Sequence, residues 1–205
     1  MADRPLPVGA VVLAAGQARR MGHSKLDLPW PQGGTVLGSV LDVLIAAGVD
    51  DCVVVTGGHR RRVETIAAGR GVRAAYNPAY AAEDMLTSIQ VGLAALGTGS
   101  AEGAFIMPAD HPLVKEKTIA GLIASWRIKP DRIWAPSYKR RRGHPILVPR
   151  VFWQALVAEE GGQGLRSFLD RQAGNIEYLN VDDAGIRIDI DDPSRYQELR
   201  DKYTS

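Results

Sequence analysis

The chain has 205 residues, of which 45% are hydrophobic and 23% are charged, and its formal net charge is +2. This composition is typical of a globular domain, and because Cys52 is the single cysteine, disulfide scaffolds are excluded along with disordered and collagen-like chains. A charge of +2 is weak for a nucleic-acid-binding protein, so no nucleic-acid partner is expected.

Neither a membrane-spanning segment nor a secretory signal is expected. The longest apolar stretches, residues 8–15 and 40–49, fall well short of the roughly 18 residues that a helix needs to cross a bilayer. The first residues also lack the long apolar segment after a basic start that marks a secretory signal. We therefore expect a cytoplasmic protein without a membrane partner.

Short β-branched runs alternate along the chain with segments whose apolar residues recur at helical spacing. Taken in chain order, the first half is predicted to contain strand 8–13, helix 35–47, strand 52–56, helix 60–68, strand 72–76, helix 84–96 and strand 104–107. The second half is predicted to contain helix 115–126, strands 133–135 and 146–148, helix 152–157, a short helix ending at 169, strand 176–181 and a helix beginning at Pro193.

One further segment, residues 186–191, alternates apolar and charged residues, which is typical of a half-exposed strand. The alternation of strands and helices, with no repeat and no linker, predicts an α/β fold. We expect a single-domain, Rossmann-like, three-layer fold with a mostly parallel central sheet, spanning residues 1–205.

The segment after the first strand combines small residues with cations. It begins Leu13-Ala14-Ala15-Gly16 and includes Arg20 and Lys25. It leaves the carboxyl edge of the sheet, where open α/β folds bind ligands, and small residues let backbone N–H groups approach a phosphate closely. The spacing fits neither a Walker A loop nor the dinucleotide fingerprint. From composition alone, the segment is either an anion-binding loop or a basic surface loop.

Carboxylates follow strands at two other places. Asp110 comes just after strand 104–107 and lies between two prolines, where a carboxylate holds Mg²⁺ or simply caps a turn. Asp189 and Asp191 are two residues apart in the predicted strand 186–191, so both should project from the same face. A metal site shared between Asp110 and one of them is therefore a hypothesis.

The residues from Leu13 to Lys25 read Leu-Ala-Ala-Gly-x-x-x-Arg-Met-Gly-x-x-Lys, and this segment resembles the signature of the MobA-like nucleotidyltransferases. The form is most similar to the molybdenum cofactor cytidylyltransferase branch of that family. The resemblance implies a nucleotide-diphospho-sugar transferase-like fold and a loop that wraps the triphosphate of a nucleotide. It assigns phosphate binding to Arg20 and Lys25.

Four other segments carry the resemblance. Residues 107–112 are similar to a Gly-Asp-Gln-Pro motif, which implies Mg²⁺ binding by Asp110, although Ala109 and His111 stand where the motif has glycine and glutamine. Residues 188–193 resemble an Asp-Ile-Asp-Thr-Pro motif, which makes Asp189 the favoured second metal ligand and Asp191 the alternative.

The remaining similarity concerns the two substrates. Asn77-Pro78 with Met85 to Ser88 resembles an Asn-Pro…Gly-Met-x-x-Ser segment, and Gly143-His144-Pro145 resembles an element that lines the acceptor side. Ser88 could instead be a capping or solvent-facing hydroxyl, and His144 could be a packed or hydrogen-bonded histidine. The ligand-binding residues implied by the resemblance are Leu13, Ala14, Ala15, Gly16, Arg20, Lys25, Asn77, Ser88 and His144.

The function implied is a Mg²⁺-dependent nucleotidyl transfer in which an acceptor phosphate oxygen attacks the α-phosphorus of a nucleoside triphosphate and pyrophosphate is released. Lys25, Arg20 and Asp110 would carry catalysis. CTP is the expected nucleotide, because relatives that use GTP have glycine where this chain has Ala15. The expected acceptor is the molybdenum cofactor, a molybdopterin, with transient contact to a molybdenum enzyme or its chaperone. The alternatives are another phosphorylated acceptor, such as a sugar phosphate or phosphocholine, and a nucleotide-binding module without catalysis.

Overall fold

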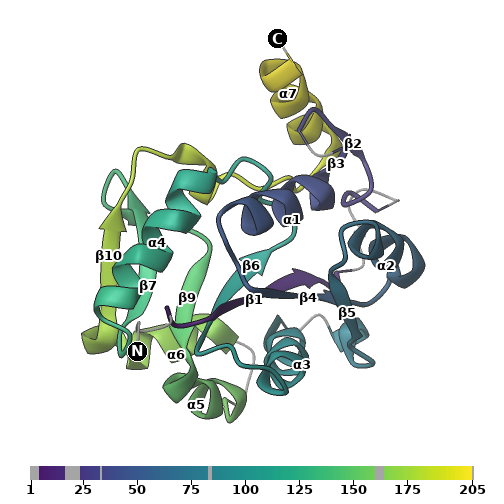
Figure 1. The fold of residues 1–205 in the computed structure, drawn as a ribbon. Helices are drawn as coiled ribbons and strands as arrows, with labels where there is room; N and C mark the ends of the chain where they lie inside the picture. Colours follow the sequence, from purple (N-terminus) through teal and green to yellow (C-terminus); the bar gives the residue numbers. More distant parts are fainter. Residues whose placement is uncertain (1–4, 17–23, 33, 83–84, 160–163, 205) are drawn as a thin grey trace.

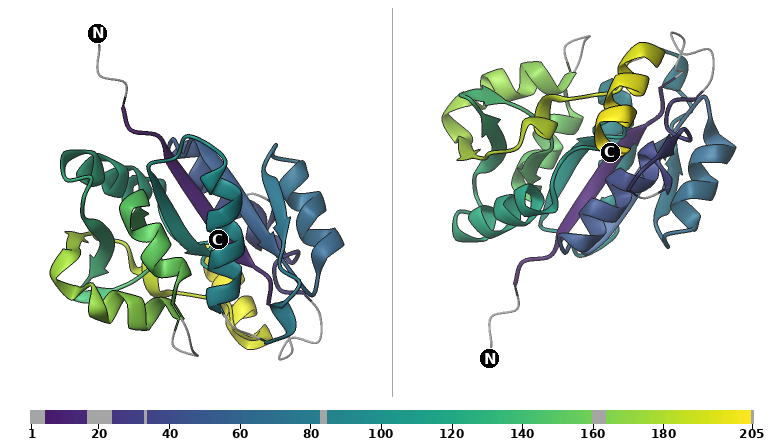
Figure 2. Two further views of the ribbon diagram at one scale, coloured as in Figure 1. Left: turned by 90° about the horizontal axis from the view of Figure 1, so that it is seen from below. Right: turned by 90° about the horizontal axis from the view of Figure 1, so that it is seen from above.

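The computed structural model describes residues 5–16, 24–32, 34–82, 85–159 and 164–204, and it places a central sheet between two layers of helices (Figures 1 and 2). The strands lie in the order β10-β7-β9-β6-β1-β4-β5, and β8 pairs with β7 at one side. Their bounds are β1 Val8–Ala14, β4 Asp51–Thr56, β5 Arg73–Tyr76, β6 Gly103–Pro108, β7 Ile133–Tyr138, β8 Arg141–Arg142, β9 Ile146–Pro149 and β10 Ile176–Asn180.

The sheet is mostly parallel, as predicted. β9 runs antiparallel to both β6 and β7, β8 runs antiparallel to β7, and the other pairs in the sheet are parallel. β1 lies between β4 and β6 with Leu13 opposite Val55 and Pro108. The carboxyl ends of these three strands therefore meet at one edge of the sheet, which brings their following loops together.

Helices cover both faces because β1 is apolar on both. Ala10 and Val12 pack with α1, α2 and α4, whereas Val11 packs with α3, α5 and α6. The bounds of the helices are α1 Val36–Ala46, α2 Arg60–Ala68, α3 Met85–Gly97, α4 Glu116–Ile128, α5 Trp153–Val157, α6 Gly164–Arg171 and α7 Pro193–Thr204. Gly92 lets α3 lie close on the sheet, since a Cβ there would be 2.2 Å from Val11 Cγ1.

The last helix, α7, is attached to a small two-stranded sheet, β2 (Pro29–Trp30) and β3 (Gly34–Thr35), that precedes α1. The Tyr196 hydroxyl donates to the Pro29 carbonyl at 2.7 Å, and the Tyr196 and Trp30 rings lie 6.3 Å apart between centroids. The C-terminal part of the chain is thereby held against residues 29–35.

The prediction of a strand over residues 186–191 is wrong. A 3₁₀ turn, η4 (Ala184–Arg187), begins the segment, and the backbone from 188 to 192 belongs to no strand. Its hydrogen bonds go to loops, because Ile190 N–H donates to the Asp110 carbonyl at 3.0 Å and the Ile186 carbonyl accepts from His144 N–H at 2.8 Å. The alternation arises because Ile186 and Ile190 are buried while the residues between them are not fully buried.

The other predicted elements are present, with ends that differ by a few residues. The short strands β2, β3 and β8 were not predicted, and neither were the 3₁₀ turns η1 (Tyr80–Ala82), η2 (Arg150–Phe152) and η3 (Ala173–Asn175). None of the helices in the described part of the chain combines the length and the apolar character that a bilayer crossing requires.

Candidate active site

A cluster of charged side chains lies at the carboxyl edge of the sheet, at the end of β6. Lys25 Nζ is 2.6 Å from Asp110 Oδ2 and 3.4 Å from Asp191 Oδ1. The loop that carries Asp110 is anchored to β1, because Ala109 N–H donates to the Leu13 carbonyl at 3.2 Å. The structure therefore brings together a lysine, an aspartate after β6 and an aspartate from the 188–192 segment.

Asp110 uses both of its carboxylate oxygens. Oδ2 contacts Lys25, and Oδ1 is 3.1 Å from Nδ1 of His111. Burial by itself would raise the pKa of the Asp110 carboxyl, but the hydrogen bond from His111 and the charge of Lys25 outweigh burial and hold that pKa well below its ordinary value. Asp110 is therefore a carboxylate at every physiological pH.

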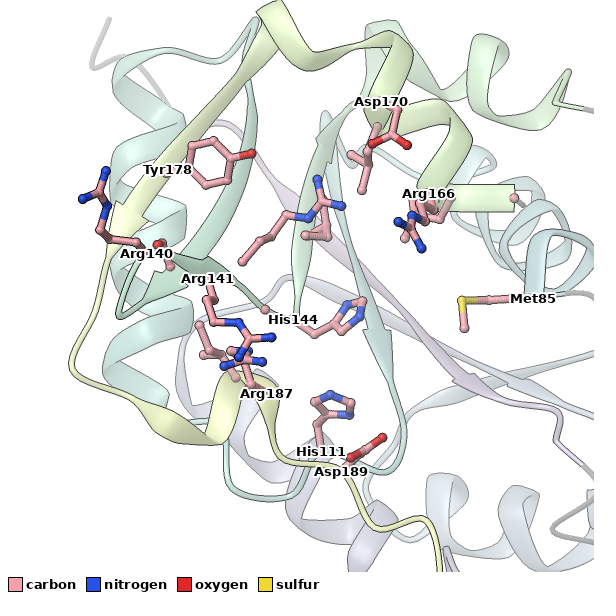
Figure 3. A pocket seen from close by; sticks show the side chains of 18 of the residues that line it. Met85, His111, Arg140, Arg141, His144, Arg166, Asp170, Tyr178, Arg187 and Asp189 are labelled. Carbon is pink, nitrogen blue, oxygen red and sulfur yellow. The ribbon is translucent and has the colours of Figure 1, made fainter. Parts of the chain in front are cut away.

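The two C-terminal aspartates differ in their surroundings. Asp191 contacts Lys25, whereas Asp189 lines a pocket beside His111 and, within the described residues, has no hydrogen-bond or ion-pair partner (Figure 3). No group of three or more histidine, cysteine, aspartate or glutamate side chains is gathered for a metal among the residues described. A pair of carboxylates nevertheless fits Mg²⁺, which takes oxygen ligands and completes its shell with waters and substrate phosphates.

An open cleft of about 1630 Å³ begins at His111 and extends over β8, α6 and η4 (Figure 3). Five arginines line it, against two aspartates, Asp170 and Asp189. Within the described part of the chain, none of the five forms an ion pair with a carboxylate, so the cleft carries an excess of positive charge suited to an anionic ligand. These arginines are Arg140, Arg141, Arg142, Arg166 and Arg187.

His144 lies at the inner end of this cleft. Its ring meets the ring of His111 edge-on, with centroids 5.3 Å apart and an interplanar angle of 81°. Its Nδ1 is buried and has no hydrogen-bond partner among the described residues. Burial, together with the neighbouring His111, lowers the pKa of His144 to about 4, so the ring is neutral at physiological pH.

The predicted nucleotide loop is described in part. Leu13 and Ala14 end β1, Ala15 and Gly16 follow it, and Arg20 lies outside the described residues. The Ala15 carbonyl accepts from Gly58 N–H at 3.5 Å, and a Cβ on Gly57 would lie 2.3 Å from the Ala15 oxygen. Only glycine at 57 allows the loops after β1 and β4 to approach so closely.

Asn77 and Ser88 lie together and bind each other. Nδ2 of Asn77 donates to Oγ1 of Thr87 and to Oγ of Ser88, both at 3.0 Å, and its Oδ1 accepts from Ala79 N–H at 2.9 Å. Asn77 and Ser88 are both buried. These bonds fix the turn after β5 against the first turn of α3, and ligand binding by the two residues stays a prediction.

Several residues of the site were not found from the sequence. Arg166 and Arg187 come from α6 and η4, and only the tertiary fold places them beside the arginines of residues 140–142. Asp183 is fully buried and accepts from Lys115 N–H at 2.9 Å and from Thr118 Oγ1 at 2.7 Å. It thereby connects the start of α4 to η4, which it caps by accepting from Gly185 N–H at 2.9 Å.

The mostly parallel sheet, with a charged cluster at its carboxyl edge, is typical of an α/β nucleotidyltransferase. The pattern of the MobA-like NTP transferase domain matches residues 10–176, and the chain belongs to this family.

Among curated proteins, the chain is 28% identical to the molybdenum cofactor cytidylyltransferase of Escherichia coli, over 96% of this chain and 97% of that protein. It is 27% identical to the nicotine blue oxidoreductase of Paenarthrobacter nicotinovorans, over 93% and 96% of the two chains. Among solved structures, Rv0371c of Mycobacterium tuberculosis is 28% identical with a TM-score of 0.83, covering 97% of this chain and 100% of that one. A structure of Rv0371c in complex with manganese is similar as well, with 27% identity, a TM-score of 0.77 and coverage of 95% and 98%.

Proposed function

We propose that the protein transfers CMP from CTP to the phosphate of a molybdopterin-type acceptor. An oxygen of the acceptor phosphate forms a bond to the α-phosphorus of CTP, the bond from that phosphorus to the bridging oxygen breaks, and pyrophosphate leaves with the electron pair. The observation that carries the proposal is the contact of Lys25 with Asp110 and Asp191, directly beside an arginine-lined cleft. The E. coli relative's name supports the choice of nucleotide and acceptor.

Positioning and charge stabilisation carry such a reaction, since it requires no covalent nucleophile. Backbone N–H groups of residues 13–16, with Arg20 and Lys25, bind the triphosphate in this proposal. Asp110 and Asp189 hold Mg²⁺, with Asp191 as the alternative to Asp189. Magnesium, when bound, would offset the negative charge of the phosphates. The manganese complex of Rv0371c supports a divalent ion at a site of this family.

The acceptor belongs in the cleft between β8, α6 and η4. Guanidinium groups bind phosphate through paired hydrogen bonds, and these arginines lose no ion pair within the described residues when they do so. Figure 3 shows Arg141 and Arg187 directed toward the end of the cleft where His144 and His111 lie. An acceptor phosphate bound there is adjacent to Asp110.

Nucleotide choice tests the proposal. A methyl group at Ala15 crowds a purine more than a pyrimidine, and a contact of this size changes kcat/KM by roughly 10- to 200-fold. We expect CTP to exceed GTP by about that factor when pyrophosphate release is measured with Mg²⁺ and molybdenum cofactor. The matched variant Ala15→Gly should reduce the ratio of kcat/KM for CTP to kcat/KM for GTP.

ATP, UTP, a sugar phosphate and phosphocholine serve as comparison substrates in the same assay. A higher kcat/KM with GTP than with CTP would refute the cytidylyl assignment and leave the family assignment intact. Pyrophosphate release that proceeds with a sugar phosphate or phosphocholine, and not with molybdenum cofactor, would refute the acceptor.

A further inference from the structure

His111 stands where the family motif has glutamine, and its ring contacts the carboxylate at the centre of the site. Nδ1 of His111 lies 3.1 Å from Oδ1 of Asp110, while the other oxygen of Asp110 faces Lys25 at 2.6 Å. An ionised carboxylate only accepts hydrogen bonds, so Nδ1 is the atom that donates. The two contacts together restrict rotation of the Asp110 carboxylate.

The ring of His111 is itself held in place. Its side chain is 9% exposed, and the ring of His144 packs edge-on against it at 5.3 Å (Figure 3). The backbone next to it is fixed as well, because the Asp110 carbonyl accepts from Ile190 N–H and Ala109 N–H donates to the Leu13 carbonyl. The donor at Nδ1 is therefore presented to Asp110 from a rigid surrounding.

We propose that His111 is a positioning residue: through Nδ1 it holds the carboxylate of Asp110 in the orientation that binds the metal and the triphosphate. This role rests on the proposed function, since it presumes that Asp110 faces the metal and nucleotide. Groups that hydrogen-bond a ligating carboxylate orient it, and their loss typically weakens metal binding by about 10- to 100-fold. His111 does not need to touch either substrate to act in this way.

Two other roles for His111 make different demands on its ring. Direct contact with the acceptor would use Nε2, which is on the far side of the ring from Nδ1, and simple packing against His144 would need no nitrogen. Three substitutions separate these roles. An Asn side chain places an amide near the position of Nδ1, a Gln side chain reaches toward the position of Nε2, and Phe keeps the ring without a donor.

The experiment measures Mn²⁺ affinity in the presence of CTP and without acceptor, from the electron paramagnetic resonance signal of free Mn²⁺, with CTP affinity from calorimetry. Neither readout depends on turnover or on the identity of the acceptor. We expect His111→Asn to stay within about 3-fold of the wild type, and His111→Gln and His111→Phe to bind Mn²⁺ about 10- to 100-fold more weakly. Circular dichroism checks that each variant is folded, and the Asn and Gln variants control for each other because they differ by one methylene.

The possible results separate the roles. Wild-type affinity in the Phe variant would show that His111 only packs, and wild-type affinity in the Gln variant with loss in the Asn variant would assign the role to Nε2. Either result overturns the proposal and leaves the proposed function standing. A wild-type protein that binds no CTP would overturn the proposed function and this role with it.

Discussion

Lys25 contacts two aspartates that are distant from it in the sequence, Asp110 and Asp191. The side chain of Asp191 is 52% exposed, so its contact with Lys25, at 3.4 Å, contributes at most about 1 kcal/mol to stability. Such a weak contact breaks readily when a polyanion approaches. In the proposed function, a triphosphate would replace the Asp191 contact while Lys25 keeps its contact with Asp110 at 2.6 Å.

The choice between Asp189 and Asp191 is tested by comparing two isosteric substitutions. Asp189 lines the cleft without a partner in the described residues, so a cation there would displace no existing contact, whereas a cation at Asp191 would compete with Lys25. We expect Asp189→Asn to weaken Mn²⁺ binding in the presence of CTP by about 10-fold or more, and Asp191→Asn to weaken it by less. The reverse order, measured by the same titration, would make Asp191 the ligand.

The turn between β7 and β8 places two cationic residues in a backbone conformation that costs free energy. Lys139 and Arg140 occupy it with φ of 50° and 61°, in the left-handed region, where a two-residue hairpin turn favours asparagine and glycine. A side chain there costs about 1–2 kcal/mol per residue. Because cations at these positions destabilise the fold, their presence favours a role in binding an anionic ligand over a role in folding.

We expect the triple variant Arg140→Ser, Arg141→Ser, Arg142→Ser to raise KM for a phosphorylated acceptor by about 10-fold or more, because each lost guanidinium removes a charge-assisted hydrogen bond. KM for CTP should change little, and circular dichroism should show an intact fold, since exposed charges contribute little stability.

The matched control replaces Arg195, Arg200 and Lys202 of α7 with serine, which removes the same charge at a distance from the cleft. If the triple variant of residues 140–142 kept the wild-type KM for the acceptor and lost salt-sensitive binding to RNA or DNA, its three arginines would form a nucleic-acid-binding surface instead.

Strands were predicted correctly from the sequence where burial on both faces requires a continuous apolar run. β1, β4 and β6 are buried on both faces, and their continuous apolar runs reveal this. The prediction failed at residues 186–191, because alternation reports which residues are buried and not whether the backbone pairs with a sheet. Ile186 and Ile190 are buried, but the backbone of their segment forms hydrogen bonds with two loops and not with a strand.

At the site, the same reasoning picked out Lys25 and Asp110, which contact each other, because motif spacing is a local property. Their catalytic roles remain predictions. Arg166 and Arg187 could not be found in this way, because their part in the cleft depends on how α6 and η4 pack beside β8. The contact of His111 with Asp110 depends on a side-chain rotamer, which no sequence pattern records.

Over the whole molecule, acid should destabilise the fold through His144. Burial first, and then the charge of His111 and Arg142, lower the pKa of His144 from 6.5 to about 4, against the opposing influence of Asp110. Between these two values the unfolded chain binds a proton that the folded chain does not, so stability falls as pH falls from about 6.5 to about 4. The loss attributable to His144 is at most about 3 kcal/mol.

Urea unfolding at pH 7, 5.5 and 4.5 measures this loss. The variant His144→Phe keeps an aromatic ring against His111 and cannot titrate, so its free energy of unfolding should fall less steeply over the same range. Parallel curves for the two proteins would show that other groups cause the acid sensitivity. Asp110, whose pKa is lowered, adds a further loss only at more acidic pH, below its unfolded value.

The segment after β10 completes the charged cluster, so the cluster forms late in the synthesis of the chain. Lys25 and Asp110 are translated early, but Asp191 and the Ile190 N–H that binds the Asp110 carbonyl come after every strand of the sheet, and Tyr196 reaches back to Pro29 later still. The charged cluster is therefore complete only after residues 188–196 have been translated and have docked.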